Sequence, residues 1–256
     1  MPTPTNKPIP RGFETYAEAK KRRDRKSRLL NQGNNHQQRQ ASKLNRCRKK
    51  ERCESGACDV CVGKFRLRLF RQTLPLFQSR PVWTRASVIT SGMLKPFDGL
   101  LDVDLDAIAK VVDKRLERSS LRDRLVVVGI DISLNLQDNE IIGWQLHLYL
   151  LIEGEDTLQL REAVKAAFPP EPTAPKPYVF GPVTDFEKAI TYLFKAIFHR
   201  RSRYKNDDGR ARTKDLPLKG RDLRKLLPFL DQYPIGARLI LRGIRRNGRR
   251  LVVIQK

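Results

Sequence analysis

Two stretches of apolar residues in the middle of the chain constrain its fold most strongly. Residues 125–134 and 141–152 are both rich in β-branched side chains, and the polar segment Gln137-Asp138-Asn139 separates them. This pattern predicts two antiparallel strands joined as a hairpin. Because side chains alternate across a strand, the even-numbered residues of both strands form one apolar core face. We therefore expect the protein to be built around a β-sheet.

Short strands and amphipathic helices are predicted around this hairpin. The strands cover residues 85–90 and 178–180, and the helices cover residues 104–119, 157–168 and 184–199. The third helix opens with the capping-box pattern Thr184-x-x-Glu187. These elements predict an α+β protein with an antiparallel sheet and helices packed on one of its faces.

Polar side chains lie at odd-numbered positions of the two central strands, opposite the core. A three-residue loop keeps both apolar faces together and sets Asp131 opposite either Gln145 (loop 137–139) or His147 (loop 138–140). A carboxylate, an amide oxygen and an imidazole then converge, and a hard divalent ion accepts such a set. The alternative is that His147 is an ordinary histidine of a sheet.

The third predicted helix carries a polar stripe of Lys188, Tyr192, Lys195 and His199. A tyrosine with a lysine one turn further on can act as a nucleophile whose phenolate is stabilised by a cation. An ordinary surface helix also has a polar face, so Tyr192 as a surface or packing residue is the alternative. Tyr204 is a rival nucleophile, but it lacks a helix-borne lysine partner.

Four cysteines follow the pattern Cys47-x5-Cys53-x4-Cys58-x2-Cys61. Zinc binds four thiolates as a tetrahedron, and the two-residue spacer lets one turn supply two of them. The spacing predicts a structural zinc module. Reduced structural cysteines are the alternative, and a redox pair is a weaker one.

The charge of the chain indicates a polyanionic partner. Lys and Arg number 52 against 28 Asp and Glu, which leaves a net charge of +24. Nucleic acid is the usual partner of so basic a protein, and an anionic membrane is the competing one. No apolar run approaches the roughly 20 residues of a spanning helix, and no signal segment follows Met1. We therefore expect a cytoplasmic protein that binds nucleic acid and no membrane.

The chain divides into four predicted regions. Residues 1–45 are expected to be a basic, disordered arm that orders on DNA or serves as a solvated tail. Residues 46–80 form the zinc module, and residues 81–204 form the α+β domain. Residues 205–256 form a basic extension whose strands 238–243 and 249–254 face each other across Asn247-Gly248. The expected DNA contacts are Arg22, Arg23, Lys49, Lys50, Arg200, Arg201, Arg242, Arg245, Arg246 and Arg249.

Over residues 84–200 the order of motifs resembles the HUH endonucleases, which include rolling-circle replication initiators and single-strand transposases. Val88-Ile89-Thr90 is similar to their first motif, Gln145-Leu146-His147 to their His-hydrophobic-His motif, and Tyr192-x-x-Lys195 to their tyrosine motif. The cysteines resemble the metal-binding knuckles of some initiators. The chain departs from the family at Gln145, which stands where the first His is expected.

The resemblance implies a ferredoxin-like fold and a metal-assisted nuclease for single-stranded or hairpin DNA. Asp131, Gln145 and His147 would hold Mg²⁺ or Mn²⁺, Tyr192 would attack the phosphate, and Lys195 would support the charge. The products would be a 5′-phosphotyrosine link and a free 3′-OH. Two alternatives remain open on the same scaffold, a DNA-binding protein without catalysis and an RNA-binding protein.

Overall fold

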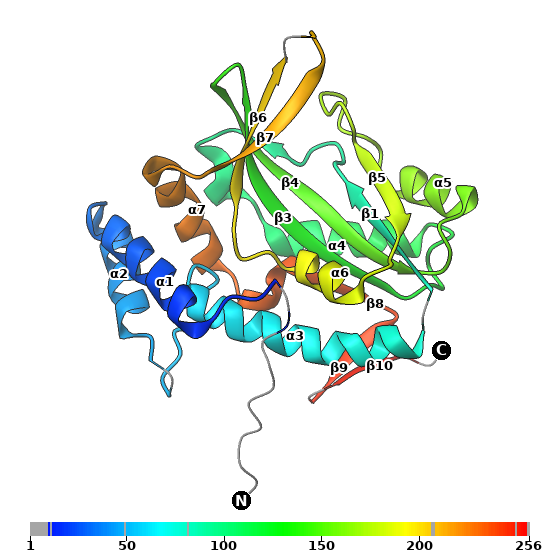
Figure 1. The fold of residues 1–256 in the computed structure, drawn as a ribbon, viewed down its shortest axis with the longest axis horizontal. Coiled ribbons are helices and arrows are strands. Elements are labelled where there is room, and N and C mark those ends of the chain that lie inside the picture. The colour runs from blue at the N-terminus through cyan, green and yellow to red at the C-terminus, as the bar shows by residue number, and fades with distance from the viewer. Residues whose placement is uncertain are drawn as a thin grey trace, which may run out of the picture.

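A curled, mixed β-sheet forms the centre of the protein (Figure 1). The structure is a computed structural model, and it describes residues 10, 12–48, 50–80, 82–205, 208–248 and 250–254. The main path of the sheet runs β5-β1-β4-β3-β6-β7, with β2 paired to β4 and β8 paired to β3. Its strands are β1 (Trp83–Val88), β2 (Leu94–Lys95), β3 (Val126–Gln137), β4 (Glu140–Glu153), β5 (Tyr178–Pro182), β6 (His199–Lys205), β7 (Ala211–Pro217) and β8 (Leu239–Arg242).

The predicted central hairpin is confirmed as β3 and β4, and its register sets Asp131 opposite His147. The loop is shorter than expected. Asp138 and Asn139 have φ angles of 50° and 69° and form a two-residue turn between the paired Gln137 and Glu140. A bulge then leaves Ile142 without a partner, and this extra residue restores the even register.

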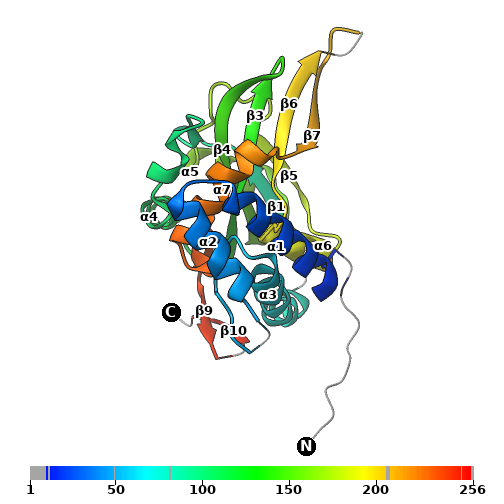
Figure 2. The same ribbon diagram turned by 90° about the vertical axis from the view of Figure 1, so that its left-hand side faces the viewer.

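Seven α-helices lie among the described residues, on both faces of the sheet rather than on one (Figure 2). They are α1 (Tyr16–Asn31), α2 (Asn35–Arg46), α3 (Asp59–Ser79), α4 (Leu105–Glu117), α5 (Leu158–Ala167), α6 (Phe186–Leu193) and α7 (Gly220–Gln232), and two short 3-10 helices are η1 (Gly99–Asp102) and η2 (Ile235–Arg238). The prediction of helices on one face is therefore wrong.

The reason is that both faces of the central strands carry apolar residues. Even-numbered residues of β3 and β4 pack with α4, α5 and α7 in the larger core. The odd-numbered Val127 and Leu151 are fully buried in a second cluster with α3 and α6. We call the face formed by the odd-numbered residues of β3 and β4 the odd face. On β3, polar residues occupy the odd face only from Asp131 onward. One half of the odd face therefore belongs to the hydrophobic core, and the other half carries the predicted site residues.

The sheet is mixed because β6 runs parallel to β3. His199 pairs with Ser133 and Arg203 with Gln137. The chain crosses the odd face in α6 before it enters β6, and it therefore returns in the direction of β3 (Figure 1). The predicted purely antiparallel sheet is wrong at this strand.

The N-terminal region is helical where a disordered arm was expected. Helices α1 and α2 begin with capping boxes at Thr15 and Asn34. The buried stripe of α1 is Ala19, Arg23, Ser27 and Leu30, so two of its four members are polar. The sequence pattern missed this stripe because it shows little apolar periodicity. Residues 1–9 and 11 of the expected arm lie outside the described residues.

The C-terminal hairpin forms with different strands from those expected. Across Asn247-Gly248, β9 (Ile244–Asn247) pairs with β10 (Arg250–Val253) as a separate two-stranded sheet. Residues 239–242 instead form β8, which pairs with Val126–Gly129 of β3. Part of the predicted extension is thus a strand of the central sheet.

Helices of the described residues include none that is long and apolar enough to cross a membrane.

Candidate functional site: a basic cleft and a cysteine cluster

A cleft of about 960 Å³ opens on the odd face of the sheet. Asp131 of β3, His147 of β4, Tyr192 of α6 and Lys195 all line it. Four residues that are up to 64 positions apart in the chain are thus brought together. We call this site the basic cleft because its lining includes seven cations: Arg85, Lys176, Lys188, Lys195, Arg201, Arg203 and Arg212.

A glycine lets α6 approach the sheet at this point. A Cβ atom at Gly129 of β3 would overlap the carbonyl oxygen of Leu193, the last residue of α6. Since α6 ends there, Lys195 lies beyond the helix and not on it, contrary to the helix predicted over 184–199. The close contact at Gly129 therefore sets where Tyr192 and Lys195 lie relative to β3.

Lys195 forms an ion pair with Asp131, with 2.7 Å between Nζ and Oδ2. Burial favours the neutral form of Asp131 and is the largest single influence, but the charge and hydrogen bond of Lys195 together with the charges of His147 and Arg238 outweigh it, and the pKa of the carboxyl is lowered. The Asp131 carboxylate is therefore ionised, and it holds the lysine against the floor of the cleft. The same ammonium lies 5.1 Å from the centre of the Tyr192 ring.

His147 is buried and neutral. Burial and the nearby charge of Arg201 lower the pKa of its imidazole to about 3. Its Nε2 lies 2.7 Å from the hydroxyl oxygen of Ser133. When Nε2 carries the proton, the hydroxyl accepts from the imidazole and donates to Oδ1 of Asn135 at 3.1 Å; in the other tautomer the hydroxyl can donate to Nε2. The neutral ring is the form that can bind a metal ion.

Gln145, the third predicted metal ligand, does not line the cleft. Its side chain is buried, and its amide nitrogen donates to the carbonyl oxygen of Leu146 at 3.0 Å. Asp131 is already paired with Lys195. The expected set of three ligands therefore does not fit a divalent ion in this arrangement, although Asp131 and His147 face each other in forms that can bind one.

Two tyrosines form the aromatic part of the cleft. The rings of Tyr149 and Tyr192 are 5.9 Å apart, and Tyr192 is 44% exposed. Burial raises the pKa of Tyr149 to about 12, which keeps its hydroxyl protonated. Tyr192 is thus the more accessible of the two phenols.

The predicted DNA contacts separate into buried and exposed groups. Arg23 is buried and donates to the carbonyl oxygen of Cys47, and Arg200 is buried in a two-point ion pair with Asp222. Arg22 pairs with Glu14 and Asp59, and Arg242 pairs with Asp113. These guanidinium groups are used within the fold, so the sequence overestimated them as DNA contacts. Lys50, Arg245 and Arg246 are exposed and Arg201 lines the cleft, whereas Lys49 and Arg249 lie outside the described residues.

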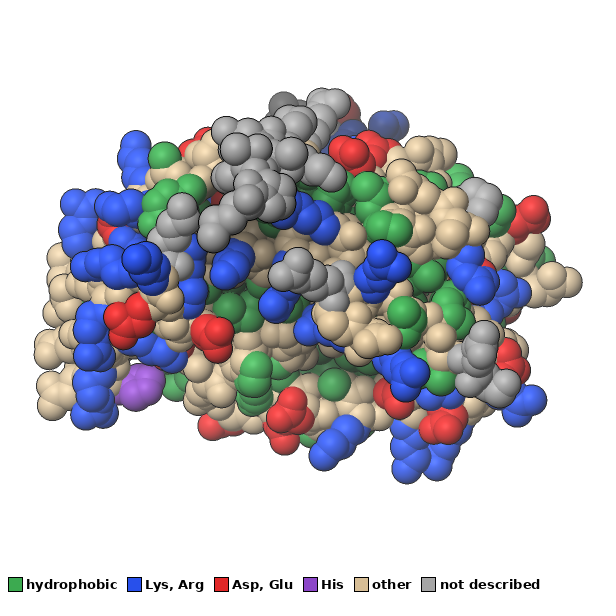
Figure 3. Space-filling view, turned by 90° about the horizontal axis from the view of Figure 1, so that it is seen from below, with side chains coloured by type: hydrophobic (Ala, Val, Ile, Leu, Met, Phe, Trp, Pro, Cys, Tyr) green, Lys and Arg blue, Asp and Glu red, His purple; other side chains and the backbone are tan. Residues whose placement is uncertain are grey.

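Other exposed cations gather at the end of the molecule formed by α1 and α2 (Figure 3). They include Lys21, Arg25 and Arg28 of α1 and Arg39 and Arg46 of α2. Sequence reasoning assigned two arginines of α1 to DNA, but the exposed face of that helix carries different ones.

Arg238 is buried beneath the cleft, although the sequence pattern placed it on an exposed hairpin. Its guanidinium donates to the carbonyl oxygens of Ile130 at 3.1 Å and of Lys195 at 3.0 Å. It also lies 4.1 Å from the centre of the Phe194 ring, and burial lowers its pKa to about 10. Arg238 thus joins β3 to the segment that carries Lys195. No sequence signal marked it among its many neighbouring arginines.

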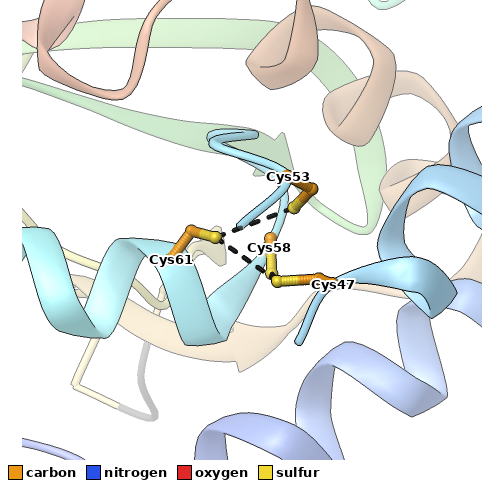
Figure 4. A group of neighbouring side chains, drawn as sticks. All are labelled: Cys47, Cys53, Cys58 and Cys61. Carbon is orange, nitrogen blue, oxygen red and sulfur yellow. Dashed lines mark hydrogen bonds between the residues drawn. The ribbon is translucent and has the colours of Figure 1, made fainter. Parts of the chain in front are cut away.

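The four cysteines lie close together at the junction of α2 and α3 (Figure 4). Cys47 caps the end of α2, and Cys58 and Cys61 lie at the start of α3. The sulfur of Cys61 is 3.5 Å from that of Cys47 and 3.7 Å from that of Cys53, and Cys58 is 3.8 Å from Cys47. All four sulfurs lie within 4.8 Å of one another, so this cysteine cluster could hold a metal ion.

The electrostatics of the cysteine cluster favour an anionic sulfur. Thiol hydrogen bonds, first from Cys53 and then from Cys58, lower the pKa of Cys61 to about 2. The hydrogen bond with Cys53 instead raises the pKa of Cys58. A cation at the centre would remove this competition, because it binds all four sulfurs as thiolates.

Comparisons with models of protein families, with curated proteins and with solved structures give no match for this chain.

Proposed function

We propose that this chain is a DNA-binding protein of the replication-initiator type, which nicks and joins single-stranded DNA in the basic cleft. The observation that carries the proposal is the convergence of Asp131, His147, Tyr192 and Lys195 on one cleft. The motifs that carry the HUH resemblance are far apart in the sequence, and a chance match gives no reason for them to share a site.

The order of the elements also supports the proposal. The sequence β1-α4-β3-β4-α5-β5 makes an antiparallel sheet in the order β5-β1-β4-β3, and α4 and α5 contribute to the same core cluster. This is the order of a ferredoxin-like fold, which the resemblance implies. Tyr192 lies on α6. This helix packs on the face of the sheet opposite α4 and α5, which is the face that carries the cleft. We propose that residues 83–195 correspond to the catalytic core of the family.

In the proposed reaction, the hydroxyl of Tyr192 attacks a backbone phosphorus of bound DNA. A bond forms between the phenolic oxygen and phosphorus, and the bond from phosphorus to the 3′ oxygen breaks. The phenol loses one proton, and the leaving 3′ oxygen gains one and becomes the free 3′-OH. Lys195 and Arg201 supply positive charge where negative charge develops on the phosphate. Because the expected metal ligands do not fit as a set of three, we derive no step through Mg²⁺ or Mn²⁺.

We further propose that the ion held by the cysteine cluster is zinc. With Zn–S bonds of about 2.3 Å, the sulfurs of a tetrahedral site lie about 3.8 Å apart. The contacts of 3.5, 3.7 and 3.8 Å are close to that value. Four thiolates with no other donor are typical of closed, structural zinc sites. The proposed role is to join α2 to α3.

The test is incubation of labelled single-stranded DNA with the protein and Mn²⁺, with and without chelator, followed by a denaturing gel. We expect a covalent protein–DNA band that is lost in Tyr192→Phe. Tyr204→Phe is the matched control, because Tyr204 is also 44% exposed and does not line the cleft. Loss of the band in the control alone would move the nucleophile to Tyr204.

A DNA- or RNA-binding protein without catalysis is the second candidate, and the position of Gln145 outside the cleft favours it. It predicts tight, salt-sensitive binding and no covalent band with any metal. That result would contradict the proposed nuclease activity, and the basic cleft would remain a proposed binding site for nucleic acid.

A further inference from the structure

Each of the three side chains expected to bind a divalent ion has a partner within the protein. Oδ2 of Asp131 lies 2.7 Å from Nζ of Lys195. Nε2 of His147 lies 2.7 Å from the hydroxyl oxygen of Ser133. The buried amide of Gln145 donates to a backbone carbonyl oxygen and does not line the basic cleft. All three side chains are thus held by contacts inside the fold.

The ion pair of Asp131 and Lys195 is supported from the backbone side by Arg238. The guanidinium donates to the carbonyl oxygens of Ile130 at 3.1 Å and of Lys195 at 3.0 Å. Because Ile130 precedes Asp131 in β3, the arginine connects the backbones of both members of the ion pair. The two residues that flank Lys195 in the chain are buried in a cluster with residues of α3. The backbone that carries the ammonium is therefore fixed beside the carboxylate.

The ammonium of Lys195 is also open to a ligand. Its side chain is 27% exposed, and both it and Asp131 line the cleft. An ammonium has three donors, so the hydrogen bond to Asp131 leaves two for the oxygens of a phosphate. A divalent ion bonded to the same carboxylate would be repelled by the ammonium and by the guanidinium of Arg238. A cation of the chain thus already lies at the carboxylate that was expected to bind the metal.

We propose that the ammonium of Lys195 takes the place of the divalent ion in the basic cleft. Asp131 is then a positioning residue for this lysine instead of a metal ligand. The ammonium supplies positive charge and hydrogen-bond donors to a DNA phosphate, as the ion would. The inference rests on the proposed function for the reaction that the cation serves, and it makes the cleft independent of Mg²⁺ and Mn²⁺.

The first experiment measures Mn²⁺ binding to the protein without DNA, by electron paramagnetic resonance. The variants are Lys195→Met, Lys195→Arg, and the double variant that combines Lys195→Met with Asp131→Asn. Lys188→Met is the matched control, because this lysine also lines the cleft and its loss changes the net charge equally.

Lys195→Met should bind Mn²⁺ at least about tenfold more tightly than the wild type, because the carboxylate loses the competing cation. Lys195→Arg keeps a cation and should bind Mn²⁺ as weakly as the wild type. The double variant and Lys188→Met should do the same. A purely structural ion pair would give no gain of metal binding. The absence of a gain in Lys195→Met would overturn the inference, as would an equal gain in the double variant or in Lys188→Met.

The second experiment begins with the wild type, so it does not depend on the folding of a variant. The affinity for short single-stranded DNA is measured by fluorescence anisotropy in chelator and in dilute Mn²⁺, at constant ionic strength. We expect equal affinity in the two conditions. Lys195→Met should lose about tenfold in chelator and recover part of this loss with Mn²⁺. Weaker DNA binding by the wild type in chelator would overturn the inference.

Failure of the proposed nuclease is distinct from these outcomes, because neither measurement needs cleavage. A gain of Mn²⁺ binding in Lys195→Met without a covalent band in the wild type would keep Lys195 as the cation of the cleft and remove the nuclease. A covalent band of the wild type that requires Mn²⁺ would keep the nuclease and overturn the inference.

Discussion

The cysteine cluster and the basic cleft are assembled in opposite ways. The cluster draws its four sulfurs from a segment of 15 residues, 47–61, and three of the four cysteines are buried. The cleft draws its lining from seven strands and helices between residues 85 and 215 and is open to solvent. The cluster thus depends on local spacing, and the cleft depends on the whole sheet. A change at the cluster should therefore act on stability, and a change at the cleft should separate stability from binding.

The largest expected effect is the loss of the metal. Cys61→Ser removes one sulfur of the proposed zinc site and should remove most of the roughly 10 kcal/mol that structural zinc contributes in small zinc proteins. We expect no bound zinc by a colorimetric chelator assay, and a lower melting temperature. Chelator should lower the melting temperature of the wild type and leave that of the variant unchanged. An equal melting temperature with and without metal would mean that the four cysteines are ordinary buried cysteines and hold no structural metal.

The next effect tests the approach of α6 to the sheet. Gly129→Ala places a methyl group against the carbonyl of Leu193 and should cost about 3 kcal/mol of unfolding free energy in urea. It should also weaken binding of single-stranded DNA, because Tyr192 and Lys195 move with α6. Gly181→Ala is the control, since the added methyl meets only the flexible side chain of Arg85. Unchanged stability in Gly129→Ala would mean that α6 is free to shift.

A smaller effect is expected at the buried arginine. Arg238→Met leaves the carbonyls of Ile130 and Lys195 without their donor and should cost about 2 kcal/mol. The displaced Lys195 should reduce DNA affinity beyond the loss in Arg245→Met, an exposed arginine of the same C-terminal region. Equal DNA affinity in the two variants would restrict Arg238 to a role in packing.

The smallest effect is a pH dependence from His147. Its pKa is about 3 in the folded protein against 6.5 unfolded, so the unfolded chain takes up the proton first as the pH falls below 6.5. Folding stability should then fall by about 1.7 kcal/mol between pH 6.5 and pH 5, and His147→Gln should remove most of this fall. Urea unfolding at several pH values measures it, with the exposed His36→Gln as control. A fall of the same size in His147→Gln would assign the pH dependence to other groups.

The features that could be predicted from the sequence are those that depend on residues close together in the chain. The β3–β4 hairpin, its core face and the cysteine cluster all follow from residues close together in the chain. The register of Asp131 with His147 was one of two predicted alternatives. The bulge at Ile142, which sets this register, has no signature in the apolar pattern of the sequence.

The features that sequence missed depend on distant partners. Nothing in residues 199–205 shows that they run parallel to β3, and nothing in residues 239–242 shows that they pair with its other end. Arginines were the hardest residues to assign. Arg23, Arg200 and Arg238 are buried, and only a carbonyl or carboxylate from far along the chain distinguishes them from the exposed ones.

One edge of β3 is divided between two partners. Residues 126–129 pair with β8, residues 133–137 pair with β6, and the guanidinium of Arg238 fills part of the interval at Ile130. Residues 238–242 are therefore needed to complete a strand that is made about 100 residues earlier in the chain. A nascent chain released before residue 238 would lack both β8 and the arginine, and its Asp131 would border an unpaired sheet edge. The cleft is thus bordered by a fully paired strand only after residues 238–242 have been added.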